Sequence, residues 1–357
     1  MMCEKQQNIP YRKFFAKHMV WRREEVILMD FLTFSSVILI SAVIFVNGWT
    51  DAPNSIATAV GSGVMKLRSA VVIAAFCNFF GVLSVVFIGG RVSETVCRLV
   101  AYDGDAVSAL WILCCAMLSV VAWSLAAWFF GIPTSESHAL IAGLCGSAIG
   151  VRGTAETRPL ILALVGLVLS TVLAVIVGIL VYRIISKLKL GNKKCAALQK
   201  MSAGLSSFAH GAQDGQKFIG LFALWAALSQ GNAADISLDI DGNISVLAVC
   251  ICSVIMTAGT ACGGGRIVQK VGFGMASLDA VDGACADIAS FLCILFCTLL
   301  GMPVSTTHTK TCAIVGACRG RVNRRTVGEM VVAWVLTVPV CFACSFALSS
   351  LLCRYFN

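Results

Sequence analysis

Long runs of apolar residues, separated by short polar stretches, make up most of the chain. Seven runs reach about 18 residues or more, the length at which a helix crosses a bilayer core of about 30 Å. They lie near residues 27–46, 69–88, 108–130, 159–182, 244–262, 280–300 and 327–352. Shorter apolar pieces lie at 55–64, 133–149, 201–228 and 303–318. Because a membrane β-barrel needs alternating strands of about ten residues instead, the pattern predicts an all-α polytopic membrane protein with roughly 10–12 membrane helical segments.

Composition agrees with a membrane location. Hydrophobic residues make up 58% of the chain and charged residues 13%, more apolar surface than one soluble core would hide. The 18 cysteines are scattered through apolar segments, which predicts reduced packing residues. Residues 1–26 lack the apolar core of a signal peptide and are expected to form an amphipathic tail. The formal charge of +9 gathers in loops, so the expected partner is the lipid bilayer and no nucleic acid.

Three motifs occur twice, in the same order. They are "NGWTDAPNSIA" (47–57) with "HGAQDGQKFIG" (210–220), "GGRV" (89–92) with "GGRI" (264–267), and "GIPTSESHALIAGLCGSAIG" (131–150) with "GMPVSTTHTKTCAIVGACRG" (301–320). Three matches in register indicate an internal duplication. We therefore expect a first transmembrane repeat at 27–181, a basic cytoplasmic linker at 182–200 and a second transmembrane repeat at 201–357.

The charges of the loops predict how the repeats are oriented. Segments 319–325, 182–200 and 263–270 are basic and are expected on the cytoplasmic side, whereas 231–243 is acidic. The two apolar pieces between 280 and 318 must then enter and leave by one face, as a re-entrant hairpin tipped by "PVSTTH". The matching hairpin, tipped by "PTSESH", enters from the opposite face. The sequence thus predicts two inverted-topology repeats with broken helices and two re-entrant helical hairpins. The side of the basic N-terminal tail stays open, because this path places it outside.

The first apolar run ends in a cluster of polar and helix-breaking residues. Irregular backbone at membrane depth is tolerated only where it is buried in protein or lines a watery cavity, and broken helices in inverted repeats mark a midplane site. We expect Gly48 and Pro53 to break the helix. The polar residues expected to face a ligand in the two halves are Asn47, Asp51 and Asn54, and His210, Gln213, Asp214 and Gln216 in a corresponding break.

Each hairpin tip has the sequence of a helix N-terminus, because Pro133 or Pro303 precedes hydroxyl residues. Two such termini from opposite faces would bring N–H groups, positive dipole ends and hydroxyls together, which suits an oxyanion. Asp51 and Asp214 would repel that anion unless a cation or a proton binds beside it. The residues predict cation-coupled anion uptake. The hydroxyl residues are Thr134, Ser135, Ser137, Ser305, Thr306 and Thr307.

The paired motifs, and above all "MPVSTTHTKTCAIVGA" (302–317), resemble the inorganic phosphate transporter (PiT) family over about residues 35–350. The resemblance implies a symporter of inorganic phosphate with sodium or protons, working by alternating access in the cytoplasmic membrane, with no cofactor and no enzymatic activity. It implies phosphate-binding roles for Thr134, Ser135, Ser305, Thr306, Gln213 and Asn54. It implies cation coupling by Asp51, Asp214, Asn47, Asn54 and Thr307, with Asp51 and Asp214 as sodium ligands if sodium is coupled. Further candidates are His210, Gln216, Lys217, Glu136, Ser137, His138 and His308.

Two departures from the family pattern leave alternatives open. Glu136 stands where the family usually has Thr, and Lys217 stands where the first half has Asn54. A sulfate permease of the same family is therefore the runner-up, ahead of a passive anion channel and an intramembrane hydrolase built from Ser, His and Asp. His138 and His308 are expected to hydrogen-bond their own hairpins, one turn after the tip serines. Asp287 and Lys310 either pair or face a cavity. The coupling ion and a homodimeric assembly also stay open.

Overall fold

The computed structural model describes residues 9–101, 106–151, 154–230 and 246–356. The acidic segment 231–243 lies outside the described residues. The described elements are helical apart from two two-residue strands, which pair antiparallel. Their bounds are α1 Ile9–Thr50, η1 Ala52–Ile56, α2 Ala57–Gly61, α3 Leu67–Leu83, α4 Val85–Ile88, α5 Arg91–Cys97, β1 Val100–Ala101, α6 Ala106–Phe129, α7 Glu136–Gly150, β2 Thr154–Ala155, α8 Thr157–Lys187, α9 Asn192–Ser229, α10 Val246–Cys262, α11 Gly265–Val268, η2 Gln269–Phe273, α12 Ala280–Leu299, α13 Thr306–Ala317 and α14 Arg324–Phe356.

The structure confirms an all-helical, multi-span membrane protein. Among the described residues, six helical stretches are long and apolar enough to cross a bilayer, and a seventh arises if 246–262 and 265–273, bent by 64°, form one span. Large apolar side chains on the outside of α8 and α14, such as Val168, Val172 and Val335, are more than half exposed. In water such a surface would be costly, so this belt faces lipid.

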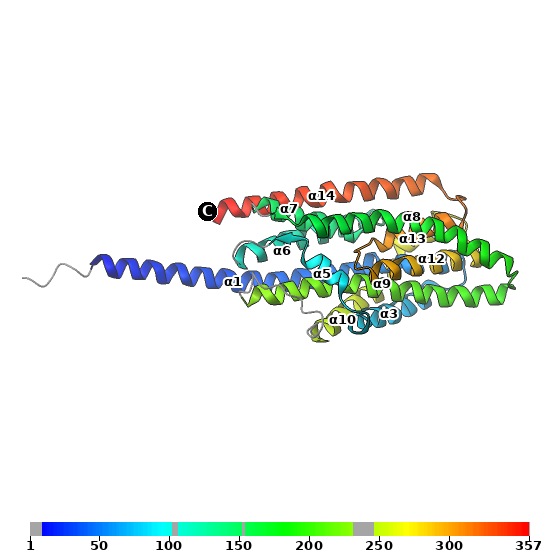
Figure 1. Cartoon of the computed structure of the whole chain (residues 1–357), viewed down its shortest axis with the longest axis horizontal. Helices are drawn as coiled ribbons and strands as arrows, with labels where there is room; N and C mark the ends of the chain where they lie inside the picture. The colour runs from blue at the N-terminus through cyan, green and yellow to red at the C-terminus, as the bar shows by residue number, and fades with distance from the viewer. Residues whose placement is uncertain (1–8, 102–105, 152–153, 231–245, 357) are drawn as a thin grey trace, which may run out of the picture.

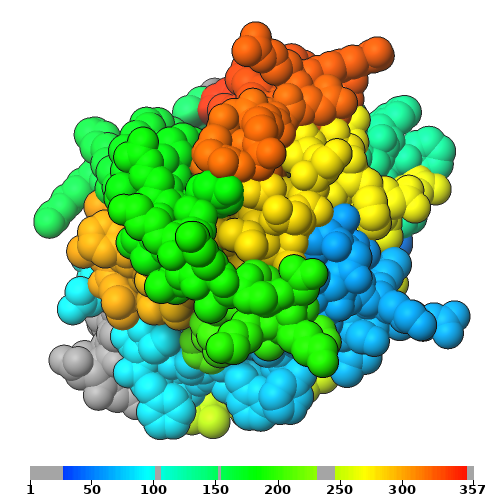
Figure 2. Space-filling model, turned by 90° about the vertical axis from the view of Figure 1, so that its right-hand side faces the viewer, coloured from blue at the N-terminus to red at the C-terminus, as the bar shows by residue number. Residues whose placement is uncertain are grey.

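The long helices run along one axis of the molecule, and two helical hairpins lie between them (Figure 1). One hairpin consists of α6 and α7, and the other of α12 and α13. In Figure 1 the first hairpin occupies the half of the molecule that contains the C-terminus, and the second occupies the other half. Their tips, at 130–135 and 300–305, therefore point toward the middle of the molecule. On the end drawn in Figure 2, the green segment where α8 leads into α9 lies beside the yellow segment near the start of α12.

Helices of the two sequence halves pack against each other throughout. Helix α1 contacts α10, α3 contacts α9, α7 contacts α14 and α8 contacts α13. Glycines permit the closest of these contacts: a Cβ on Gly48 would lie 2.2 Å from the Met256 carbonyl oxygen of α10. At the matching position in the second half, a Cβ on Gly211 would lie 2.4 Å from the Asn78 carbonyl oxygen of α3. The two halves thus form one interlocked bundle rather than two separate domains.

We expect Gly48→Ala to destabilise the protein by about 1–3 kcal/mol, because the added methyl group overlaps a backbone carbonyl that cannot rotate away. The measurement is the midpoint of thermal unfolding in detergent. Gly328→Ala is the matched control, since a Cβ on this exposed glycine of α14 meets nothing within 4 Å. Equal unfolding midpoints for Gly48→Ala and the wild type would contradict the close approach of α1 and α10.

Two expectations about the breaks are wrong. Gly48 does not break the first helix, because α1 runs through it to Thr50 and the break begins at Asp51. The second half has no break at all at 210–220, since α9 is helical from Asn192 to Ser229. The difference follows from Pro53: the duplicated motif has Gln216 in its place, and Gln keeps the N–H that a continuous helix requires.

The basic segments 182–200 and 263–270, expected as loops, are largely helical. The stretch 182–200 is the end of α8, the four connecting residues 188–191 and the start of α9. Residues 265–273 form α11 and η2, and Arg266 Nη1 of α11 donates to the Phe129 carbonyl at the end of α6 (2.7 Å). Arg91, in the duplicated motif, donates to the Leu299 carbonyl at the end of α12 (3.0 Å). The two arginines therefore hold the two hairpin tips in equivalent ways.

Candidate functional site

Asp51 lies where the first helix ends. It is 4% exposed and precedes the 3₁₀ turn η1, whose second residue is Pro53. Its carboxylate accepts hydrogen bonds from Asn54 Nδ2 (2.9 Å), from the Thr306 hydroxyl (3.2 Å) and from the Thr307 hydroxyl. Asn54 also donates to the Thr307 hydroxyl (2.9 Å). The break after α1 thus brings a buried carboxylate to the tip of the second hairpin.

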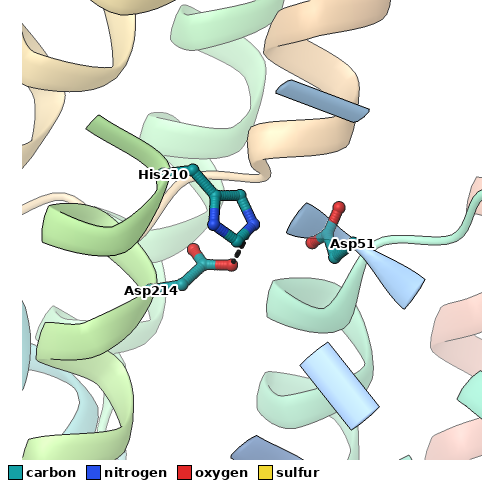
Figure 3. Close-up of side chains that lie close together, drawn as sticks. All are labelled: Asp51, His210 and Asp214. Carbon is teal, nitrogen blue, oxygen red and sulfur yellow. Dashed lines mark ion pairs between the residues drawn. The ribbon is translucent and has the colours of Figure 1, made fainter. Parts of the chain in front are cut away.

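Asp214 faces Asp51 from the unbroken helix α9, together with His210 one turn away (Figure 3). Asp214 is 1% exposed and accepts from Asn47 Nδ2 (2.9 Å) and Lys217 Nζ (2.5 Å). His210 Nε2 lies 3.4 Å from its Oδ2. One ligand atom each of Asp51, His210 and Asp214 lies within 4.8 Å of the others. Carboxylate oxygens and an imidazole nitrogen this close can hold a cation, which would balance the buried negative charge that the Lys217 ammonium leaves uncompensated.

The two hairpin tips begin helices with serine N-caps, as their sequences suggest. The Ser135 hydroxyl accepts from the His138 N–H, and the Ser305 hydroxyl accepts from the His308 N–H, both at 3.3 Å. A ring nitrogen of His138 also lies 2.7 Å from the Ser135 hydroxyl. The two imidazoles contact each other in a tilted arrangement, 4.6 Å between centroids, and the His308 ring likewise lies tilted against Trp334 at 3.8 Å. Each histidine thus contacts its own tip serine and the opposite hairpin, in keeping with a structural part.

Lys217 forms hydrogen bonds with Asp214 and with both hairpin tips. Its ammonium donates to the Ser137 hydroxyl at the first tip (2.6 Å) and to the Val304 carbonyl at the second (2.8 Å). Ser137 itself donates to the Val304 carbonyl (2.7 Å). Because Lys217 is 3% exposed, all of these contacts are shielded from water. The two hairpins are therefore joined through one buried ammonium group.

Glu136 extends the site on the side of Asp51. Its Oε1 accepts from the Thr50 hydroxyl (3.2 Å), while its Oε2 has no hydrogen-bond donor among the described residues. A small pocket opens beside it. The lining residues are Thr50, Asp51, Ser124, Trp128, Ile132, Thr134, Glu136 and Ile267. Thr134 thus lines the same pocket as the carboxylates of Asp51 and Glu136.

Gln213 and Gln216 of α9 form hydrogen bonds with different parts of the structure. Gln213 donates to the Met302 carbonyl (3.1 Å) and accepts from the Thr298 hydroxyl, so it supports the second hairpin tip. Gln216 accepts from the Val92 N–H of α5 (3.0 Å). Among the candidate residues, Gln213 is placed at the tip, and Gln216 is engaged with the backbone of another helix.

Asn78 was missed in the sequence although it belongs to the same buried network. It lies 3.1 Å from the His210 ring and donates to the Thr260 hydroxyl (3.1 Å). An amide inside the apolar run 69–88 is itself a signal of a functional or structural polar contact.

A second buried polar cluster lies between α12, α13 and the turn after α1. Asp287, which is fully buried, pairs with Lys310 and accepts from the Thr58 hydroxyl (2.5 Å). Lys310 also donates to the Ser55 carbonyl (3.0 Å). Of the two possibilities that the sequence left open for these residues, the structure shows pairing.

Comparisons with known proteins agree with this architecture. The profile of the "Phosphate transporter family" matches residues 47–345. The chain is 35% identical over 323 residues to the "Probable low-affinity inorganic phosphate transporter" of Rhizobium meliloti, covering 87% of this chain and 92% of that protein. It is 30% identical over 327 residues to the protein of the same description in Bacillus subtilis, covering 87% and 95%.

A solved structure, "The sodium-dependent phosphate transporter", has the same fold. It superposes with a TM-score of 0.80 at 21% identity and covers 90% of this chain and 98% of its own. Profile, sequence relatives and fold therefore agree over nearly the whole membrane part of the chain. This multi-span membrane protein belongs to the phosphate transporter family, a family of transporters rather than enzymes.

Proposed function

We propose that the chain imports inorganic phosphate together with sodium ions or protons across the cell membrane. Family membership and the names of its relatives support phosphate as the substrate. The observation that carries the coupling is the meeting of two helix N-termini, at Ser135 and Ser305, beside the buried carboxylates of Asp51 and Asp214. The helix N-termini favour an anion, and the buried carboxylates favour a cation.

The phosphate would bind between the hairpin tips. Helix N-termini offer unpaired N–H groups and a positive dipole end, which stabilise a tetrahedral oxyanion. The side chains we assign to it are those of Thr134, Ser135, Ser305, Thr306, Gln213 and Asn54. Lys217 adds a positive charge at the same place, joined to both tips. We assign cation coupling to Asp51, Asp214, Asn47, Asn54 and Thr307. Of the two carboxylates, Asp214 has the Lys217 ammonium beside it, so Asp51 is the one that would attract a mobile cation.

Alternating access follows from treating the two sequence halves as inverted repeats. The hairpins point toward the middle from opposite ends (Figure 1), and each packs against the last helix of the other half, α7 on α14 and α13 on α8. In transporters built from inverted repeats, rocking of one bundle against the other exposes a midplane site to each side in turn. We propose that the interlocked pairs of helices move as such bundles.

The hydrolase alternative receives less support. Ser135 and its neighbour His138 are in contact, but the imidazole lies tilted against His308. The hydrogen-bond donors to Asp51 are Asn54, Thr306 and Thr307. A triad requires the acid to orient the histidine, and here Asp51 is engaged elsewhere.

The test is uptake of radiolabelled phosphate into proteoliposomes with sodium and pH gradients imposed separately. We expect accumulation above equilibrium with at least one of the two gradients, and unlabelled phosphate should compete better than sulfate. Protein-free vesicles are the control. Flux that only equilibrates, whatever the gradient, would favour a passive channel, and stronger competition by sulfate would favour a sulfate permease.

A further inference from the structure

The two halves of the site contain equivalent triads that differ in charge. In the duplicated motifs Asp51 matches Asp214, Asn54 matches Lys217 and Thr307 matches Ser137. The contacts match as well: Asn54 donates to the Asp51 carboxylate and the Thr307 hydroxyl, both at 2.9 Å. Lys217 donates to the Asp214 carboxylate (2.5 Å) and the Ser137 hydroxyl (2.6 Å). Where the first half has a neutral amide, the second half has an ammonium.

The ammonium already neutralises Asp214. Lys217 binds its Oδ1, and Asn47 donates to its Oδ2. Both groups are at most 3% exposed, so the pair exchanges neither partner with water readily. A buried carboxylate needs one compensating positive charge. Lys217 is part of the chain and cannot dissociate as a bound ion can. Asp214 therefore keeps its compensating charge throughout transport and does not require a transported ion.

The Asp51 half lacks such a charge and holds an extra carboxylate. None of the residues that line the pocket beside Asp51 and Glu136 is basic. Glu136 Oε2 is buried and has no donor among the described residues. Asn54 Oδ1 in this half and Asn47 Oδ1 beside Asp214 also lack donors among those residues, so the halves differ in the extra carboxylate and not in the amides. Glu136 is 5% exposed and Asn54 is 3% exposed. Oxygen atoms without donors, next to carboxylates, are what a small hard cation selects, and a proton can neutralise the same pair.

We propose that this chain couples phosphate to one mobile monovalent cation, bound between Asp51 and Glu136, and that the Lys217 ammonium permanently occupies the equivalent cation position at Asp214. The inference rests on the proposed phosphate symport and adds its stoichiometry and the ligand Glu136. Sodium would bind the oxygens of Asp51, Glu136 and Thr50, which line one pocket, whereas a proton would be shared by the two carboxyl groups.

The stoichiometry is measured in proteoliposomes at zero membrane potential. At steady state, the slope of log phosphate accumulation against the log of the imposed cation gradient equals the number of cations per phosphate. We expect a slope of one for the wild type, with either sodium or protons as the driving ion. A wild-type slope of two would overturn the proposal. Phosphate accumulation with neither gradient would contradict the proposed function itself.

Lys217→Asn gives the second half the residue of the first half. We expect its slope to rise to two, because Asp214 then needs a mobile cation, while Lys217→Arg keeps the slope of one. An unchanged slope in active Lys217→Asn would overturn the proposal. Binding of ²²Na⁺ to purified protein in detergent provides a readout that does not depend on transport: if sodium is the driving ion, one site per wild-type chain supports the proposal and two sites contradict it.

Glu136→Gln tests the mobile site directly. We expect the half-saturating concentration of the driving cation to rise about 10-fold or more, as when a charged ligand group is lost. Glu329→Gln is the matched control, since Glu329 of α14 pairs with Lys270 of η2 and with Arg325, and it does not line the pocket. An unchanged half-saturating concentration in Glu136→Gln would remove Glu136 from the site and overturn the proposal.

Discussion

Asp51→Asn is expected to reduce the gradient-driven accumulation of labelled phosphate to the level of protein-free vesicles. The substitution keeps the size of the side chain but removes the negative charge that attracts the coupled cation. It also replaces one acceptor oxygen by an NH₂ group, which then faces either Asn54 Nδ2 and the Thr307 hydroxyl or the Thr306 hydroxyl. Both effects act on the transported ion and on the tip of the second hairpin. The measurement is the initial rate and the plateau of uptake under the gradient that drives the wild type.

Asp279→Asn is the matched control for this substitution. Asp279 is an exposed N-cap of α12, which accepts from the Val281 and Asp282 N–H groups at 2.8 and 2.7 Å. Because Asn caps helices about as well as Asp, its uptake should stay within about two-fold of the wild type. Size-exclusion chromatography shows whether each variant is folded. Normal accumulation by folded Asp51→Asn would refute a coupling role for this carboxylate.

Lys310→Met is expected to destabilise the protein by about 3–5 kcal/mol, because it leaves the fully buried Asp287 carboxylate without its cation. Thr58 and Ser202 still donate to that carboxylate, but hydroxyls do not neutralise its charge. Removal of both charges, in Lys310→Met with Asp287→Asn, should restore most of the lost stability. The measurement is chemical unfolding of the purified protein in detergent micelles.

Lys270→Met provides the comparison for a partly exposed pair. Lys270 binds Glu329, and the two side chains are 27% and 41% exposed, so solvent compensates for the loss. We expect a much smaller loss of stability than for Lys310→Met, because exposed ion pairs contribute little. Equal stability of Lys310→Met and the wild type would show that Asp287 carries no charge in the folded protein.

Much of the architecture is predictable because local patterns carry it. Apolar runs of sufficient length define the spans, and proline followed by hydroxyl residues defines the helix starts at Glu136 and Thr306. The duplicated motifs anticipate that both hairpins share one design. The same symmetry produces the main error: a duplicated motif suggests a duplicated break, yet only the first copy contains the proline, Pro53, that a break requires.

The sequence by itself determined the membrane class, the duplication, the two hairpins and the set of polar residues that would be too costly in lipid without a function. Only the tertiary structure decided their partners: Lys217 with Asp214, Glu136 with Thr50, and Lys310 with Asp287. It also decided that Gly48 serves helix packing and that each half packs on the other. The physical reason is the distance along the chain over which each interaction acts. Apolar length and proline act within a few residues of the chain, whereas charge pairing and close packing depend on segments that are brought together from opposite halves.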